Sequence, residues 1–155
     1  MHSPASLPIT LKQLNLPCMH SHWEEVALEA ESAHWAYPDY LATLANRELA
    51  NRHQKRIARY IREASLPVGK TLDTFDFKMG QSVNGAQITA IANNNDWVKQ
   101  GGNLVIFGPS GVGKTHIASA IGYRLAEQGV RVLFTPTTSM VQKLQQARRD
   151  YKLPD

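Results

Sequence analysis

One stretch of the sequence decides the predicted fold: Asn103-Leu104-Val105-Ile106-Phe107-Gly108-Pro109-Ser110-Gly111-Val112-Gly113-Lys114-Thr115. Its first part, residues 103–107, is a short and mainly apolar run bounded by glycines, which is typical of a buried strand. The glycines and the proline that follow indicate a turn. From Thr115 onward the residues favour a helix. The stretch therefore predicts a strand that turns sharply into a helix.

The residues after this stretch extend the pattern. Thr115 to Glu127 places apolar side chains on one helix face, and Gly129 is a natural end for that helix. Val130 to Thr135 predicts a second strand, and a further helix is expected over Ser139 to Arg149. The order of strand, loop, helix, strand and helix indicates an α/β fold, in which a parallel sheet has right-handed connections.

The loop within the stretch matches the pattern G-x-x-x-x-G-K-[ST]. Several backbone N–H groups must point inward to stabilise a polyphosphate, and glycines permit this because they have no Cβ. The following helix adds its positive end, so we expect Lys114 to contact the β- and γ-phosphates of ATP and the Thr115 hydroxyl to coordinate Mg²⁺. The alternative is a glycine-rich turn that binds nothing. The predicted nucleotide-binding residues are Gly108, Pro109, Ser110, Gly111, Val112, Gly113, Lys114 and Thr115.

The N-terminal part of the sequence is expected to be helical. Thr10 is a plausible N-cap for the first helix, and His20 to Trp35 is predicted to form a second one. No glycine or proline occurs from Asp39 to Ala64, so a long third helix is expected there. Its apolar face does not keep one register. The helix therefore either changes partners along its length or breaks near Asn46 or Asn51.

A linker is expected at residues 65–70, Ser-Leu-Pro-Val-Gly-Lys, because proline and glycine interrupt regular structure. Helical spacing resumes over residues 84–99. We therefore predict two domains: residues 1–66 form a helical N-terminal region with a basic helix, and residues 67–155 form the ATP-binding domain.

Positive charge is concentrated in one segment. The chain has a net charge of +4, and between Asn46 and Arg62 six basic residues are opposed only by Glu48, so this segment sums to +5. At about 100° per residue, most of these cations fall in one helical stripe. Such a stripe suits the phosphates of double-stranded DNA, with little sequence preference because no base-reading motif is visible. The alternative is a solvated face that aids solubility. The predicted DNA contacts are Arg52, Lys55, Arg56, Arg59 and Arg62.

Composition is ordinary for a soluble globular protein, with 155 residues, 43% of them apolar and 19% charged. The single cysteine, Cys18, cannot form an intrachain disulfide, which fits a reducing compartment. Its spacing from His20 and His22 is not a standard zinc pattern. The N-terminus lacks an apolar signal core, and no apolar run approaches the roughly 20 residues that span a bilayer. We therefore expect a cytoplasmic protein without a membrane segment.

Several segments together resemble a known family. Leu72-Asp73-Thr74-Phe75-Asp76-Phe77, followed by the loop and His116-Ile117-Ala118, is similar to the IstB-type transposition helper ATPases of bacterial insertion sequences. The segment Leu11-Lys12-Gln13-Leu14-Asn15-Leu16-Pro17 and the basic helix also resemble that family. These ATPases belong to the AAA+ class together with helicase loaders of the DnaC type. The resemblance covers essentially the whole chain.

The resemblance implies a fold and a set of partners. The implied fold is α/β: a helical N-terminal region followed by a truncated AAA+ P-loop NTPase core, a parallel sheet with helices. The implied ligands are ATP and Mg²⁺, and the implied partners are double-stranded DNA, a cognate transposase and, for the full-length protein, further copies of itself. Phe75 and Phe77 either line the adenine pocket, as the family places them, or anchor the core.

The sequence departs from the family pattern in one respect. The apolar strand ending in acidic residues, the later polar sensor and the arginine finger are all missing from these 155 residues. These groups orient Mg²⁺ and water and stabilise charge during phosphoryl transfer. We therefore assign no catalytic residue and expect hydrolysis by this chain alone to be absent or very weak.

Two alternative functions stay open. One is a DnaC-like helicase loader in DNA replication, which would bind replicative helicase instead of a transposase. The other is a non-catalytic DNA-binding remnant of a mobile element, which would hold no ATP.

Overall fold

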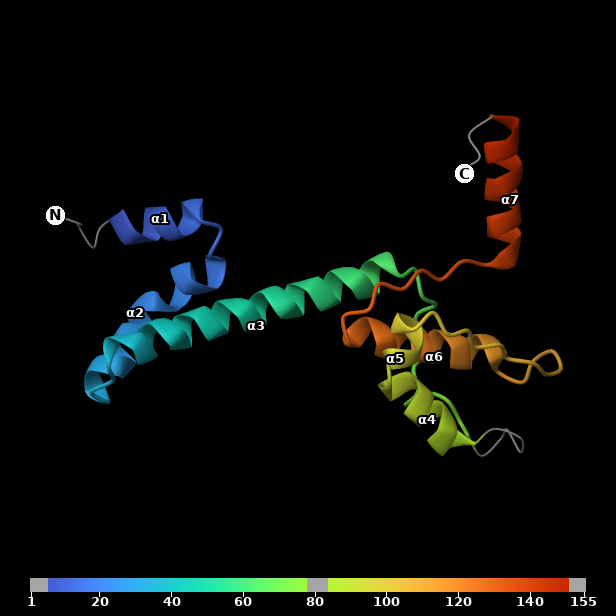
Figure 1. Cartoon of the computed structure of the whole chain (residues 1–155), viewed down its shortest axis with the longest axis horizontal. Helices are drawn as coiled ribbons and strands as arrows, with labels where there is room; N and C mark the ends of the chain where they lie inside the picture. The colour runs from blue at the N-terminus through green and yellow to red at the C-terminus, as the bar shows by residue number, and fades with distance from the viewer. Residues whose placement is uncertain (1–5, 78–83, 151–155) are drawn as a thin grey trace. The chain divides into compact units, whose positions relative to one another are not determined.

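The structure is a computed structural model that describes residues 6–77 and 84–150. The chain divides into two compact units, residues 1–56 (unit 1) and residues 57–155 (unit 2), and the division falls inside the long helix α3, Tyr37–Glu63. The expected domain boundary at residues 66 and 67 lies later in the chain and stays a prediction. Figure 1 shows the helices in chain order.

Unit 1 consists of α1 (Leu7–Gln13), α2 (Pro17–Ser32) and the first part of α3. Thr10 is not the N-cap of the first helix, because it lies inside α1, where its hydroxyl donates to the Ser6 carbonyl at 3.1 Å. Pro17 opens α2 at the first helical position, where the missing N–H of proline costs no hydrogen bond. The second helix therefore starts and ends about three residues earlier than His20 to Trp35.

The buried carboxylate of Glu48 joins α3 to the beginning of α2. Glu48 is only 3% exposed. It accepts hydrogen bonds from the backbone N–H groups of Cys18 at 2.8 Å and Met19 at 3.2 Å, and from Arg52 Nε at 3.1 Å. A helix begins with N–H groups that have no partner within the helix. Glu48 thus supplies, from 30 residues away in sequence, the cap that α2 lacks locally.

The long helix α3 is unbroken over its 27 residues, so of the two sequence-based alternatives the break near Asn46 or Asn51 is wrong. Asp39 lies in its first turn, as expected. In unit 1 the buried residues of α3 are Leu44 and Glu48.

The helices of the described part of unit 2 that follow α3 are α4 (Gly85–Asn93), α5 (Asp96–Lys99), α6 (Lys114–Glu127) and α7 (Thr137–Arg149). The side chain of Asn84 caps α4 by accepting from the N–H of Gln87 at 3.2 Å. The core of unit 2 is a cluster in which α4 packs against α6. The buried members of this cluster are Ala92, Ile117, Ile121 and Leu125.

The predicted parallel sheet is wrong, and with it the α/β fold class: the part of the chain that the structure describes is helical and contains no strand. Residues 103–107 and 130–135 have no regular secondary structure. A strand needs a neighbour to receive its backbone hydrogen bonds. Among the described residues, these segments donate two backbone hydrogen bonds, and neither forms a ladder: the N–H of Phe134 donates to the carbonyl of Ala64, which follows α3, at 2.8 Å, and the N–H of Val130 donates to the carbonyl of Leu125 in α6 at 3.0 Å.

The apolar runs pack on helices instead of in a sheet. Ile106, Val130 and Val132 lie against the α4–α6 cluster. Their neighbours Phe107 and Leu133 are 88% and 71% exposed. In residues 130–134 the side chains therefore alternate between partly buried and exposed, as in a strand but without strand pairing, whereas in residues 103–107 only Ile106 is partly buried.

The helix ends in unit 2 follow the sequence more closely. α6 spans Lys114–Glu127, and Gly129 follows it with a φ of 82°, as predicted. α7 starts at Thr137, two residues before the expected Ser139, and none of its residues is buried. No helix within residues 6–77 and 84–150 is both long and apolar enough to cross a membrane.

Candidate nucleotide-binding loop and basic helix

The loop predicted from the sequence, residues 108–113, leads directly into α6. Gly113 is the N-cap of α6, with a φ of 89°, and Gly111 has a φ of 85°. Both conformations are left-handed, which favours glycine because it has no Cβ. Residues 108–112 are exposed. Gly113 has no side chain to cap α6, and no side chain of a described residue bonds to its first N–H groups, so these groups keep their capacity to bind an anion.

Phe75 packs directly on this loop. A Cβ built on Gly113 would lie 2.6 Å from Cε2 of Phe75, so the contact excludes any side chain at residue 113. The Phe75 ring also meets the rings of Phe77 at 4.8 Å and His116 at 5.1 Å, both in edge-to-face geometry. Phe75 belongs to the residues packed against the α4–α6 cluster. This position is that of a core anchor next to the loop, and a contact with adenine stays a prediction.

Lys114 and Thr115 stand at the start of α6, as the motif requires. The Lys114 Nζ donates to the carbonyl oxygens of Gly108 at 2.9 Å and Pro109 at 2.6 Å, so the ammonium group lies over the loop. Thr115 is exposed. The start of α6 thus offers backbone amides, one ammonium group and one hydroxyl in consecutive residues, and this donor set fits a triphosphate with a hard cation such as Mg²⁺.

Three polar residues that the sequence did not predict hold the segment before the loop. His116 on α6 bonds through Nε2 with the carbonyl of Thr71 at 2.9 Å and with Oγ1 of Thr74 at 3.1 Å. The Thr74 hydroxyl also donates to the carbonyl of Gly69 at 2.7 Å. His116 therefore has a structural hydrogen-bonding role, and these bonds hold the segment that carries Phe75 close to α6.

The predicted DNA-contacting residues all lie on α3 and are exposed. Arg52 makes internal contacts: besides Glu48, it reaches the carbonyl of Asn15 through Nη2 at 2.8 Å. It therefore helps to hold the turn between α1 and α2 onto α3. This role could not be predicted from the sequence, because Asn15 lies 37 residues away.

The other cations of α3 are more available. Arg56 donates to Nδ1 of His53 at 3.0 Å, and Arg59 lies 3.8 Å from the Glu63 carboxylate. Lys55 and Arg62 make no ion pair or side-chain hydrogen bond with any residue that the structure describes. Exposed ion pairs such as Arg59–Glu63 contribute little stability, so they do not prevent binding to another anion.

The cysteine and histidines near the start of α2 do not form a metal centre. Sγ of Cys18 is 3.7 Å from Nδ1 of His22, and that nitrogen lies 2.9 Å from the Cys18 carbonyl. Among the described residues, no group of three or more potential metal ligands comes together.

Comparison with known proteins relates nearly the whole chain to one family. The sequence profile of the family described as IstB-like ATP binding protein matches residues 9–154. An insertion sequence ATP-binding protein of Sinorhizobium fredii is 46% identical over 149 residues, which are 96% of this chain and 50% of that protein. ATP-binding proteins of insertion sequences IS21 of Pseudomonas aeruginosa and IS5376 of Geobacillus stearothermophilus are each 30% identical, over 95% and 91% of this chain and 55% and 56% of their own lengths.

The chain therefore spans about half the length of the curated relatives it matches. Because the profile covers almost every residue from the first helix to the end of the last one, the chain belongs to the family of IstB-like ATP-binding proteins.

Proposed function

We propose that this chain binds ATP with Mg²⁺ through residues 108–115 and acts as a helper protein in transposition. The observation that carries the first part is the uncapped start of α6, with left-handed Gly113 before it and the Lys114 ammonium group over the loop. The names of the relatives, which describe ATP-binding proteins of insertion sequences, support the same ligand and the same biological setting.

Each group in the loop has a proposed task. Lys114 would exchange its two carbonyl partners, Gly108 and Pro109, for phosphate oxygens, which form stronger charge-assisted hydrogen bonds. The amides at the start of α6 would bind the same phosphates, and the exposed Thr115 hydroxyl would hold Mg²⁺. The cation would neutralise part of the triphosphate charge. The base would lie near Phe75, whose ring already packs beside the loop.

Equilibrium titration with ATP and Mg²⁺ tests the nucleotide site. Lys114→Ala should weaken binding by about 10- to 100-fold, because a hydrogen bond to a charged group contributes roughly 1.5–3 kcal/mol. Lys143→Ala removes an exposed lysine from α7 and is the matched control, with unchanged affinity expected. Equal and weak binding by the wild type and Lys114→Ala would contradict the proposal and favour a remnant that holds no ATP.

For DNA, we propose that the exposed cations of α3 contact phosphates of the double helix. If all five predicted cations contacted phosphates, the slope of log K against log salt would be about −4.5. Arg52, however, is held by Glu48 and Asn15. We therefore expect four phosphate contacts and a slope of about −3.6. Titrations of a fluorescent duplex at several salt concentrations measure this slope. Arg62→Ala should reduce its magnitude by about one unit, whereas Arg52→Ala should leave it nearly unchanged. Salt-independent binding would contradict the proposal.

As the protein partner we propose the transposase of the same insertion sequence. The names of the relatives place them in insertion sequences, and this supports a transposase over a replicative helicase. A pull-down with the tagged chain, in the presence of ATP and Mg²⁺, should recover the transposase. Recovery of replicative helicase without transposase would instead support the function of a helicase loader.

A further inference from the structure

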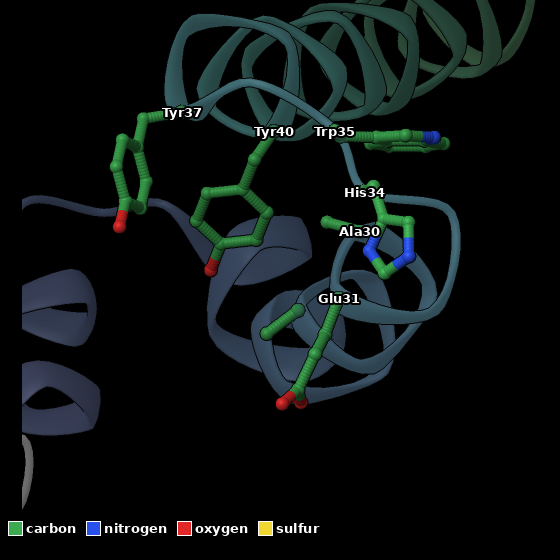
Figure 2. Close-up of a pocket in the computed structure, with 7 residues that line it drawn as sticks. Ala30, Glu31, His34, Trp35, Tyr37 and Tyr40 are labelled. Atoms are coloured by element: carbon green, nitrogen blue, oxygen red, sulfur yellow. The ribbon is translucent and has the colours of Figure 1, made fainter.

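A pocket in unit 1 lies where α2 ends and α3 begins, and nothing above assigns it a role. Its volume is about 440 Å³, which is in the range of small-ligand sites. Figure 2 shows Tyr37 and Tyr40 on one side of Ala30, and Trp35 with His34 on the other. The residues that line the pocket are Ala27, Ala30, Glu31, His34, Trp35, Tyr37 and Tyr40.

The backbone at the end of α2 brings these side chains together. The N–H of Trp35 bonds to the carbonyl of Ala30 at 2.9 Å, and the N–H of His34 bonds to the carbonyl of Glu31 at 3.3 Å. This pair of bonds closes a helix with a left-handed residue, which is usually glycine. Here the residue is His34, with a φ of 53°. A non-glycine residue in this conformation costs stability, and such strain often accompanies a functional site.

The aromatic residues of the pocket differ in exposure, and Tyr37 is the exposed one, whereas Trp35 and Tyr40 are partly buried. Tyr37 is 91% exposed, which is unusual for so large a ring. Tyr40 is fixed in place, because its hydroxyl donates to the carbonyl of Trp23 at 3.2 Å. Trp35 is partly buried. Exposed tyrosine and tryptophan are the residue types that dominate binding energy at protein interfaces.

The pocket also lies in the most acidic part of the sequence. Residues 13–46 contain no lysine or arginine and carry five acidic residues, so this segment sums to −5. Arg47 neutralises part of this charge, because it pairs with Glu25 at 3.6 Å and Glu29 at 3.4 Å. Glu31, in the pocket itself, forms no ion pair with a residue that the structure describes. The acidic residues of the segment are Glu24, Glu25, Glu29, Glu31 and Asp39.

We propose that this pocket binds an arginine side chain presented by a basic segment of a protein partner. A cation is attracted to the faces of Trp and Tyr rings, and Glu31 adds a carboxylate of opposite charge. Arginine fits better than lysine, because its planar guanidinium stacks on aromatic rings and bonds a carboxylate through two N–H groups. The acidic segment around the pocket favours the approach of a basic partner. The proposal does not depend on nucleotide binding, because the phosphate loop belongs to unit 2.

NMR titration of the isotope-labelled full chain tests the proposal. The probe is the peptide acetyl-Gly-Arg-Gly-amide, and the neutral control replaces its arginine by citrulline, which has nearly the same shape without the charge. The arginine peptide should cause saturable shifts in the Trp35 indole N–H and in the backbone amides of Glu31 and His34. The citrulline peptide should bind at least about five-fold more weakly, as expected for the loss of a charged contact.

Variants distinguish binding in this pocket from general attraction between the acidic segment and a basic peptide. Glu31→Gln should weaken binding of the arginine peptide about five-fold, because the carboxylate contact is lost. Glu24→Gln removes the same charge from an exposed position on the same helix outside the pocket, and it should leave the affinity unchanged. Trp35→Leu should abolish the binding while the other amide signals keep their positions.

Three results would overturn the proposal. The first is equal binding of the arginine and citrulline peptides. The second is an equal effect of Glu31→Gln and Glu24→Gln, which would indicate long-range attraction alone. The third is a shift of the same pocket signals on simple concentration of the protein, because the occupant would then be the basic helix of a second copy and not a separate partner.

Discussion

The beginnings of α2 and α6 have the same electrostatic requirement and meet it differently. Both helices start without a local side-chain cap, and their first N–H groups favour a negative charge. At α2 the chain supplies the charge itself, because the buried carboxylate of Glu48 accepts from the amides of Cys18 and Met19. At α6 the N-cap is Gly113, which has no side chain, and no acidic residue lies in the first turn of the helix.

The difference separates a structural helix start from a binding site. A helix start that an internal anion already caps contributes to stability and has no capacity left for a ligand. A helix start that stays open can accept an external anion, and the Lys114 ammonium group beside it strengthens that capacity. On this reasoning the start of α6 is the phosphate site that we propose, whereas the start of α2 is held by a carboxylate of unit 1 itself.

The largest expected loss of stability comes from placing a side chain at the N-cap of α6. Gly113→Ala would place a Cβ 2.6 Å from Phe75 and force a left-handed alanine. The combined strain should lower the stability of unit 2 by about 3 kcal/mol. Urea unfolding, followed by NMR signals of unit 2, measures the loss.

Gly111→Ala is the matched control for this substitution. Gly111 has a similar φ of 85°, but a Cβ there would meet no atom within 4 Å. Gly111→Ala should therefore lower the stability of unit 2 only by the cost of a left-handed alanine, about 1 kcal/mol. Equal losses in the two variants would show that Phe75 does not press on the loop as described.

A smaller effect is expected from weakening the internal cap. Glu48→Gln removes the charge that two amides of α2 and Arg52 share, and unit 1 should lose about 2 kcal/mol. Residue-resolved urea unfolding measures this loss. Glu25→Gln, which alters an exposed pair with Arg47, should cost well under 1 kcal/mol. A Glu48→Gln protein as stable as the wild type would contradict the capping role.

Because Glu48 caps α2 only when it is ionised, the stability of unit 1 should also depend on pH. Burial raises the pKa of Glu48, but hydrogen bonds from Met19, Arg52 and Cys18 outweigh it, so the pKa lies below its ordinary value of 4.5. A carboxyl group whose pKa is lowered by folding stabilises the protein above its unfolded pKa, and this contribution is lost as pH falls through the folded pKa. Below pH 4.5, wild-type unit 1 should therefore lose stability more steeply than Glu48→Gln. Parallel pH profiles of the two proteins would contradict the lowered pKa.

The sequence predicted the helix boundaries best where a residue type dictates the backbone. Gly113 and Gly129 mark the two ends of α6, because glycine favours the left-handed conformations found there. The same conformation occurs at Asn15, His34 and Ser65. The sequence did not predict these, because none of the three residue types requires it. The strained turn that builds the pocket in unit 1 was missed for this reason.

Long-range contacts set the other limit. Residues 103–107 and 130–135 have the apolar composition of strands, but composition does not say whether a pairing partner is present. Their side chains pack on α4 and α6 instead. Glu48 was counted only as a negative charge in a basic segment, because its amide partners lie about 30 residues earlier. The turn from residues 108–113 into α6 could be predicted because its residues are contiguous, and its binding of phosphate stays a prediction.

Residue-resolved NMR during titration with ATP and Mg²⁺ tests the central claim most directly. The claim is that α6 has an open helix start for a triphosphate, whereas Glu48 closes that of α2. We predict saturable shifts for the backbone amides of Gly113, Lys114 and Thr115, and none for Cys18 and Met19 at the same ligand concentrations. Shifts of equal size at both helix starts, or none at the start of α6, would contradict the account.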